Sequence, residues 1–262
     1  MCALCDRPLM TRRHGLKALA GAVLLASMAG SSDAAQNLVE PVLRIGAGEA
    51  SSGEASSPVV ALTLDACSGQ TDRLVLESLI TRQLPATLFL TAQWMARNDQ
   101  ALALIKAHPA LFAIGNHGGR HLAAVWGQSA PFGVRAAGSP EAVLAEVEAG
   151  EQAILAYFGH RPRWFRGATA HYNPQALPLI AARGYAVAGY SLNGDAGASL
   201  SAEAVTRRIE KARSGDVILA HLNHPERPCG KGLVAGLDIL RARGFRFTHL
   251  DGVWQETRSK QL

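Results

Sequence analysis

The stretch Val59–Gly69, VVALTLDACSG, is the part of the sequence that decides the fold. It is almost wholly apolar from Val59 to Leu64 and then reaches a single carboxylate, Asp65. A short apolar run bounded by turn residues is typical of a strand buried on both faces, as in a parallel sheet. The stretch therefore predicts a central strand with an acid at its carboxyl end.

Apolar, β-rich runs alternate with helical patterns along the rest of the chain, which predicts a parallel sheet covered by helices. Gly184 and Gly244 follow two of these helices, where a left-handed residue commonly ends a helix, and Ser139 with Pro140 starts the longest one. The expected strands are 59–66, 86–92, 111–116, 164–168, 185–192, 216–222 and 245–250, and the expected helices are 71–83, 99–108, 139–158, 174–183, 201–213 and 231–243.

Two architectures fit this order of elements, an open doubly wound sheet and a closed or distorted barrel, and periodicity does not separate them. No glycine-rich phosphate-binding fingerprint follows the first strand, so a nucleotide-binding sheet is disfavoured. The chain has 262 residues, of which 48% are hydrophobic, enough apolar material for one sizeable core. We expect a single domain over residues 59–255.

The N-terminus has the features of an export signal, which we place at residues 1–35. Arg12 and Arg13 precede the apolar run LKALAGAVLLASMAG and a small-residue stretch. The twin arginines resemble the signal of a protein exported in the folded state, although Gly15 stands where that pattern has a bulky apolar residue. An uncleaved anchor is the alternative, but Lys17 interrupts the run and the run is short for a membrane span. We expect a periplasmic or secreted protein with no stable membrane insertion once the signal is removed.

Residues 36–58 contain the segment GAGEASSGEASS, whose composition buries little apolar surface. The composition predicts a flexible N-terminal arm. The formal net charge is +5, and removal of the signal leaves about +3, without a basic block interleaved with aromatic residues. This balance gives no reason to expect a nucleic-acid partner.

The cysteines divide between the signal and the domain. Cys2 and Cys5 lie in the expected signal, so their Cys-x-x-Cys spacing does not predict a metal or redox site in the exported protein. Cys67 and Cys229 remain, and in an oxidising compartment they form either one disulfide or two separate thiols.

Polar side chains gather where the expected strands end. In parallel α/β folds the carboxyl ends of the strands form the edge at which ligand sites are built. This convergence is the main functional signal, and the residues are Asp65, Asn116, His117, Arg166, Asn193, Asp195, His221, Asn223 and His224.

His117 and His121 are four residues apart, which in a helical turn would place both imidazoles on one face and let them bind one Zn²⁺. Asp65 is a third ligand, a general base or an acceptor for loop N–H groups. His221, after the apolar VILA, is a general acid or a partly buried imidazole. Arg166 orients a carboxylate, in a site or in an ordinary salt bridge.

Taken in order, the segments TLDA, HGGRH, FRGA, SLNGDA and VILAH resemble the five motifs of the polysaccharide deacetylases, the NodB-homology domain of carbohydrate esterase family four. The resemblance implies a distorted (β/α)7-type barrel and a metal-dependent hydrolase that removes N-acetyl, or less often O-acetyl, groups from an acetylated glycan. It implies a divalent metal, with Zn²⁺ the first choice, on His117 and His121. It also implies Asp65 as the catalytic base, Arg166 as the residue that orients it, and His221 as the catalytic acid.

The sequence departs from the family pattern at several motifs. The family's first motif has a second aspartate as third metal ligand, and here that place is Ala66. Water or Asp65 then completes the shell, Asp72 enters from the loop, or the metal and the activity are lost. Asp195 in SLNGDA is expected to take the role of tuning His221, and glycine and alanine replace the proline that normally follows the arginine of the third motif.

The resemblance also places the first and fifth motif loops on one face of the barrel, from which we predict a Cys67–Cys229 disulfide. Trp126 and Tyr172 are candidates for stacking on sugar faces, although such aromatic residues are as often buried in a core. Asn193 and His224 are the polar substrate contacts that we expect. Two alternatives to the deacetylase are a catalytically silent carbohydrate-binding barrel and a hydrolase of a non-sugar amide on the same fold.

Overall fold

The computed structural model describes residues 38–46, 57–127 and 131–253. Strand β1 (Val59–Ala66) is the centre of its main sheet, since it pairs in parallel with β2 (Ala86–Leu90), β9 (Val217–His221) and β10 (Arg246–Thr248). On one side of β1, its first three residues pair with β10 and its last four residues pair with β2. The stretch that opens the domain is thus the strand around which the sheet is built.

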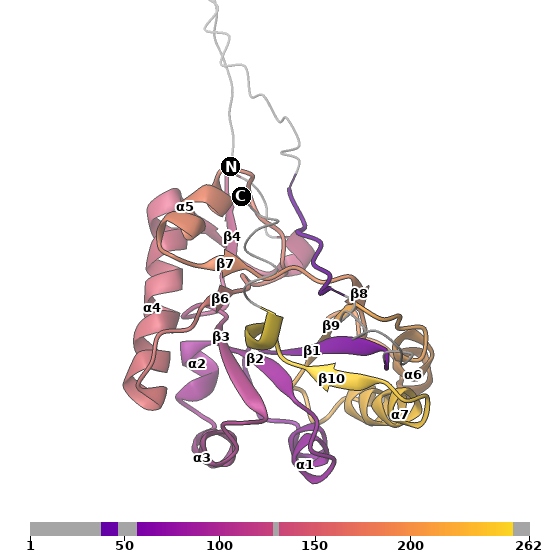
Figure 1. The fold of residues 1–262 in the computed structure, drawn as a ribbon. Coiled ribbons are helices and arrows are strands. Elements are labelled where there is room, and N and C mark those ends of the chain that lie inside the picture. Colours follow the sequence, from indigo (N-terminus) through magenta and orange to yellow (C-terminus); the bar gives the residue numbers. More distant parts are fainter. Residues whose placement is uncertain (1–37, 47–56, 128–130, 254–262) are drawn as a thin grey trace, which may run out of the picture. The chain divides into compact units, whose positions relative to one another are not determined.

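The strand order of the main sheet is β7-β6-β3-β2-β1-β9-β8, and all of its pairings are parallel. The sheet curls so that its two edges, β7 and β8, approach the N-terminal segment from either side (Figure 1). This arrangement confirms the predicted distorted (β/α)7-type barrel. The remaining strands of the sheet are β3 (Phe112–Asn116), β6 (Trp164–Phe165), β7 (Ala186–Val187) and β8 (Leu192–Asn193).

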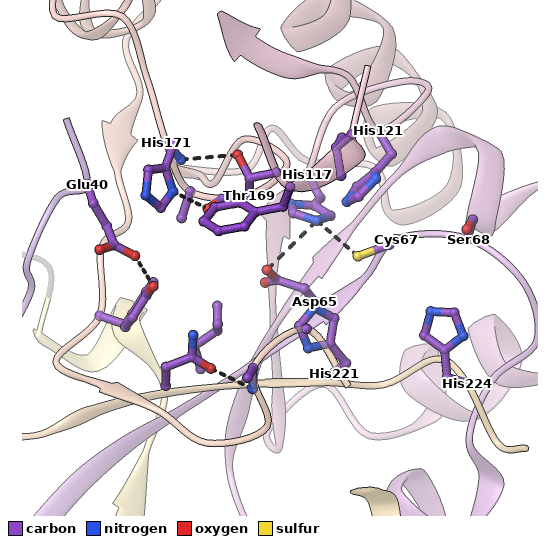
Figure 2. Close-up of a pocket in the computed structure, with 18 residues that line it drawn as sticks. Glu40, Asp65, Cys67, Ser68, His117, His121, Thr169, His171, His221 and His224 are labelled. Atoms are coloured by element: carbon purple, nitrogen blue, oxygen red, sulfur yellow. Dashed lines mark hydrogen bonds and ion pairs between the residues drawn. The ribbon is translucent and has the colours of Figure 1, made fainter. Parts of the chain in front are cut away.

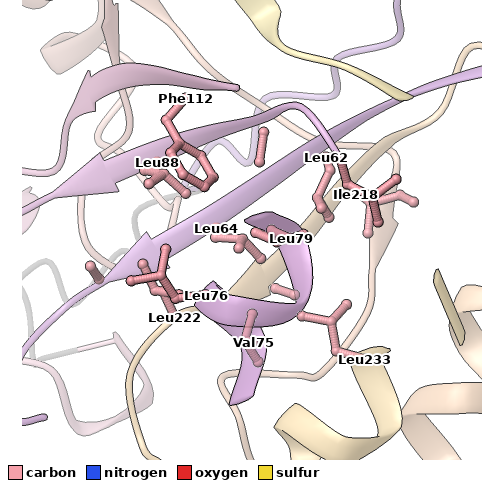
Figure 3. Packing of buried hydrophobic residues seen from close by; sticks show 14 of the residues in the cluster. Leu62, Leu64, Val75, Leu76, Leu79, Leu88, Phe112, Ile218, Leu222 and Leu233 are labelled. Carbon is pink, nitrogen blue, oxygen red and sulfur yellow. The ribbon is translucent and has the colours of Figure 1, made fainter. Parts of the chain in front are cut away.

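Helices cover the outer side of the curved sheet (Figure 1). The core between them is built from alternate residues of β1, Leu62, Leu64 and Ala66, which pack with apolar side chains of the helices, as Figure 3 shows for the leucines. The helices are α1 (Arg73–Thr81), α2 (Ala92–Met95), α3 (Asp99–Ala107), α4 (Pro140–Phe158), α5 (Ala176–Ala182), α6 (Ala202–Ile209) and α7 (Cys229–Ala242).

The predicted helices and strands are found with small shifts at their ends, except that one predicted strand is divided; α2 and the elements of one loop were not predicted. The expected strand 185–192 is divided into β7 and β8, because the N-terminal segment crosses there and hydrogen-bonds with Tyr190 in place of a neighbouring strand. A Cβ on Gly189 would meet the Pro41 carbonyl at 2.1 Å, so only glycine admits this crossing. The loop after His121 holds elements that the sequence did not predict: β4 (Ala123–Trp126), η1 (Pro131–Gly133) and β5 (Ala136–Gly138).

Residues 38–46 differ from the expected flexible arm. Val39 exchanges backbone hydrogen bonds with Tyr172, and Leu43 and Ile45 are each only 5% exposed. Their side chains join the interior cluster that includes Phe89. The composition of the glycine- and serine-rich part dominated the prediction, whereas the preceding VLRI supplies Leu43 and Ile45, which pack in the cluster with Phe89.

The predicted export signal lies outside the described residues. Contacts separate Gln36–Leu262, which contains every element above, from Met1–Ala35. In the part of the chain that the structure describes, no helix combines the length and apolarity needed to cross a membrane.

Candidate active site

A cavity of about 530 Å³ opens at the carboxyl ends of the central strands. Asp65 and His221 enter it from the ends of β1 and β9, and His117 follows the end of β3 (Figure 2). His121 and Cys67 complete the inner wall. Asp65, His117 and His221, three of the strand-end residues that the sequence singled out, are therefore brought together, as the parallel topology predicts.

Asp65 is held by Arg166, whose side chain is fully buried. The Arg166 Nη1 donates to Asp65 Oδ1 at 3.0 Å and to Thr63 Oγ1 at 2.9 Å, while Nη2 donates to the Gly189 carbonyl at 2.9 Å. Burial by itself would raise the pKa of Asp65, but the charge of Arg166, followed by those of His117 and His221, lowers it below the usual range. Asp65 is thus an ionised carboxylate in a fixed orientation.

The loop HGGRH is shaped by Glu146 of α4, which is only 5% exposed. Glu146 Oε1 accepts hydrogen bonds from the backbone N–H of Arg120 at 2.7 Å and of Leu122 at 3.0 Å. Gly118 has φ +90°, and a Cβ there would lie 2.7 Å from the same carboxylate oxygen. Only glycine therefore lets the loop approach α4 so closely.

The two histidines of this loop meet without the helical turn that their spacing suggested. His121 has a left-handed φ of 60°, and its ring centroid lies 5.1 Å from that of His117. His117 Nδ1 donates to the Arg166 carbonyl at 2.6 Å, which leaves Nε2 as the nitrogen that faces Cys67 and Asp65. A metal-binding imidazole usually donates its other ring N–H to a carbonyl or carboxylate, and the bond from Nδ1 to the Arg166 carbonyl has this role in His117.

Cys67 and the two histidines form a group suited to a metal ion. One ligand atom from each of Cys67, His117 and His121 lies within 4.8 Å of the others. Cys67 Sγ is 3.5 Å from His117 Nε2. Burial opposes ionisation of the thiol, but His117, His121 and His221 together lower the pKa of Cys67 well below its ordinary value. Sulfur and imidazole nitrogens are the ligands that Zn²⁺ accepts, so the residues present fit the metal that the family implies.

Two of our predictions about this region are wrong. Cys67 and Cys229 are both buried free thiols, so they do not form the predicted disulfide. Cys67 faces the histidines instead, and Cys229 begins α7. Asp72 is not in the metal group of the described residues: it is the N-cap of α1, and its Oδ1 accepts from the Val75 N–H at 3.3 Å.

His221 forms a pair with Asp195 at the end of β9. Its Nδ1 lies 2.9 Å from Asp195 Oδ1, and its backbone N–H donates to Asp195 Oδ2 at 2.8 Å. Burial by itself would lower the pKa of His221, but the charge and hydrogen bond of Asp195 raise it well above the ordinary value. Asp195 is only 2% exposed, so this carboxylate fixes the ring from within the protein.

Two of the four predicted substrate contacts are found at the cavity. Asn193 and His224 line the cavity. Tyr172 does not: it is fully buried and its hydroxyl accepts from the Gly167 N–H at 2.8 Å, so its assignment to sugar binding is wrong. Trp126 is partly buried against the cluster around Phe165 and is not among the described residues that line the cavity.

Sequence reasoning missed other residues of the cavity. Phe132 is 80% exposed, and its ring meets His171 edge-on at a centroid distance of 5.1 Å. Glu40 of the N-terminal segment also lines the cavity, on the same side as His171 (Figure 2), and hydrogen-bonds with Tyr190. Phe132 and Glu40 do not follow a predicted strand, so the strand-end rule had no way to find them. Cys67 did carry a signal, since it stands two residues after Asp65 and a strand alternates faces with period two.

Comparison with solved structures shows the same fold in several proteins. A peptidoglycan deacetylase from Bacillus subtilis is 18% identical, with 80% of this chain and 96% of that chain covered and a TM-score of 0.60. A family 4 acetyl xylan esterase from Clostridium thermocellum, in complex with a cobalt ion, is 24% identical, with 75% and 90% covered and a TM-score of 0.60. A family 4 pseudoenzyme from Bacillus anthracis is 16% identical, with 77% and 66% covered and a TM-score of 0.59.

A search of curated proteins found no match. The model of one protein family, described as polysaccharide deacetylase, matches residues 52–188, slightly more than half of the chain. The matched segment contains Asp65, Cys67, the HGGRH loop and Arg166, and the Asp195–His221 pair follows it in the sequence. The chain belongs to the polysaccharide deacetylase family.

Proposed function

We propose that this protein is a metal-dependent deacetylase that hydrolyses N-acetyl, or O-acetyl, groups of a cell-envelope or environmental glycan. The observation that carries the proposal is the arrangement of two charged pairs around one cavity. Asp65 stands at the end of β1 and is paired with Arg166. His221 stands at the end of the adjacent strand β9 and is paired with Asp195. The surroundings favour the carboxylate form of Asp65 and the imidazolium form of His221. This is the combination expected of a general base and a general acid.

His117 and His121 would hold the metal. A divalent cation there, Zn²⁺ first, supplies Lewis acidity that polarises the acetyl carbonyl and makes water a better nucleophile at neutral pH. The position agrees with the cavity, since both imidazoles line it beside Asp65. The buried Nδ1–H bond of His117 keeps one ring nitrogen directed at this place before any ligand arrives.

The two pairs divide the proton transfers of the hydrolysis. Asp65 accepts the proton of the attacking water as the water oxygen bonds to the acetyl carbon. His221 donates a proton to the sugar nitrogen as the carbon–nitrogen bond breaks, so that acetate and a free amine leave. Arg166 keeps Asp65 ionised and in place, and Asp195 accepts from Nδ1 of His221 so that Nε2 is the nitrogen left for the substrate.

The substrate class rests on the family and on the cavity. The similar structures include a peptidoglycan deacetylase and an acetyl xylan esterase, which support a glycan carrying amide or ester acetyl groups. The exposed ring of Phe132 and the polar Asn193 and His224 line the approach to the charged pairs. The expected export signal at residues 1–35 supports a periplasmic or secreted enzyme.

The test is acetate release from three acetylated substrates: chitooligosaccharides, peptidoglycan and acetylated xylan. We expect release from at least one of them by the zinc-loaded protein and its loss in Asp65→Asn. A protein that binds zinc and one of these glycans but releases no acetate would instead support the silent carbohydrate-binding barrel. That second candidate is favoured by Ala66 in place of the usual aspartate and by the similar family 4 pseudoenzyme. Acetate release only from small non-sugar amides would support the third candidate.

A further inference from the structure

The residue that replaces the family's missing carboxylate is indicated by the direction of side chains along β1. The strand stays regular to its end, since Asp65 pairs with Phe89 and Ala66 with Leu90. Successive side chains of a strand point to opposite faces. Ala66 therefore lies in the apolar cluster between sheet and helices, whereas Asp65 and Cys67 line the cavity.

Cys67 is also fixed where a ligand would be needed. Its carbonyl accepts hydrogen bonds from Thr91 Oγ1 at 2.7 Å and from Gln93 Nε2 at 3.0 Å, both at the start of α2. Its side chain is directed at His117, which is itself only 1% exposed (Figure 2). The thiol thus faces a buried imidazole nitrogen that makes no backbone hydrogen bond of its own, because Nδ1 takes that role.

We propose that Cys67 is the third protein ligand of the metal, so that the centre consists of one sulfur and the two imidazoles of His117 and His121. The inference rests on the proposed function only in that the site holds a divalent metal, and it names the ligand that the family pattern lacks. Three protein ligands leave one tetrahedral position open, as in catalytic zinc sites.

The other acids near the site are already engaged. Asp65 forms an ion pair with Arg166, and its Oδ2 lies 3.8 Å from His117 Nε2. Asp72 caps α1. Among the described residues, Cys67 with the two histidines is the group of three potential ligands whose atoms lie close enough to share an ion.

A sulfur ligand gives this centre a metal preference of its own. Thiolate is a soft ligand that favours Zn²⁺, whereas carboxylate and water suit Mg²⁺ and Mn²⁺. We expect the site to take zinc or cobalt and to discriminate strongly against Mg²⁺ and Mn²⁺.

Cobalt(II) substitution reads the ligand directly, without any measurement of activity. The exported protein, which lacks residues 1–35 and therefore Cys2 and Cys5, should show a sulfur-to-cobalt charge-transfer band in the near ultraviolet when it is loaded with Co²⁺. Cys229→Ser is the matched control, since Cys229 is the other buried free thiol; it should keep the band. Cys67→Ser should lose the band, and its zinc affinity should fall by more than the roughly 10–100-fold that removal of an outer-shell partner costs.

Two further variants keep the result interpretable if Cys67→Ser folds poorly. Cys67→Asp should bind one metal per chain without the charge-transfer band and with a weaker preference for zinc over Mn²⁺. Ala66→Asp combined with Cys67→Ser should not regain the metal, because residue 66 points into the apolar cluster.

A charge-transfer band that persists in Cys67→Ser would overturn the inference, as would full zinc affinity in that variant or recovery of the metal through Ala66→Asp. These outcomes are separate from the proposed function. A sulfur band without acetate release would support Cys67 as a ligand and contradict the deacetylase. Acetate release together with a zinc site that Cys67→Ser leaves unchanged would support the deacetylase and contradict Cys67 as a ligand.

Discussion

Asp65 and His221 are register partners on the adjacent parallel strands β1 and β9. Each is the last charged group of its strand at the edge where the cavity opens, and each is fixed by a buried group of opposite charge, Arg166 and Asp195 respectively. The positions of base and acid are thus set by a backbone register rather than by mobile loops. This favours a rigid site, in which a small displacement is costly to the rate.

Replacement of Asp65 should separate catalysis from binding. Asp65→Asn keeps the shape of the side chain and removes the base, and general-base catalysis typically contributes about 10²–10⁴-fold to a rate. We expect kcat to fall by that order with little change in KM, measured by acetate release. The variant also leaves the buried Arg166 without its counter-charge, so its thermal unfolding should be recorded beside its kinetics.

Asp195→Asn tests the second pair. The neutral amide of this variant no longer holds His221 Nδ1 with a charge, so the ring loses its orientation and its bias toward the protonated form. We expect kcat to fall, by no more than the roughly 10²–10⁴-fold that general acid–base catalysis typically contributes. Because Asp195 acts through His221, the double variant Asp195→Asn/His221→Asn should be no worse than His221→Asn alone. Additive losses would mean that Asp195 acts independently of the histidine.

Glu146 is expected to support the metal loop from a distance. Glu146→Ala leaves the N–H groups of Arg120 and Leu122 without their acceptor. The Leu122 group is buried, and an unsatisfied buried group costs about 1–3 kcal/mol. We expect lower stability in urea unfolding and weaker zinc binding in competition with a chelator. Glu146→Gln keeps one acceptor oxygen and should lose much less. Equal zinc affinity in all three proteins would show that the loop does not need this contact.

The N-terminal segment should stabilise the barrel. Leu43→Ala and Ile45→Ala each remove a buried side chain, which typically costs about 2–5 kcal/mol. Val42 precedes them and is 76% exposed, so Val42→Ala is the matched control and should change stability by no more than about 0.5 kcal/mol. Urea denaturation of the three variants measures these differences. Three equal midpoints would restore the expectation of a flexible arm for these residues.

The strands and helices were predictable because their patterns are local. The apolar run of β1, the glycines after α5 and α7 and the proline at the start of α4 each specify an element without reference to the rest of the chain. The parallel order then places the carboxyl ends of the strands together, which is why Asp65, His117 and His221 lie at one cavity, with Arg166 and Asp195 hydrogen-bonded to Asp65 and His221.

The rest depended on contacts between distant segments. The burial of Tyr172 follows from the packing of the loop after β6, and the role of Glu146 follows from the approach of α4 to the HGGRH loop. The wrong disulfide came from placing both cysteines on one face without knowing their directions. Cys67 follows the alternation of β1 into the cavity, whereas Cys229 begins a helix.

The central claim is that hydrolysis of an acetylated glycan depends on one metal ion held at His117 and His121. The most direct measurement is acetate release by protein stripped of metal with a chelator and then titrated with Zn²⁺. The account predicts no release from the stripped protein and recovery that saturates at one zinc per chain, and a His117→Ala variant that does not recover. Release that is the same with and without metal, or a protein that holds one zinc and releases no acetate from any of the three substrates, would contradict it.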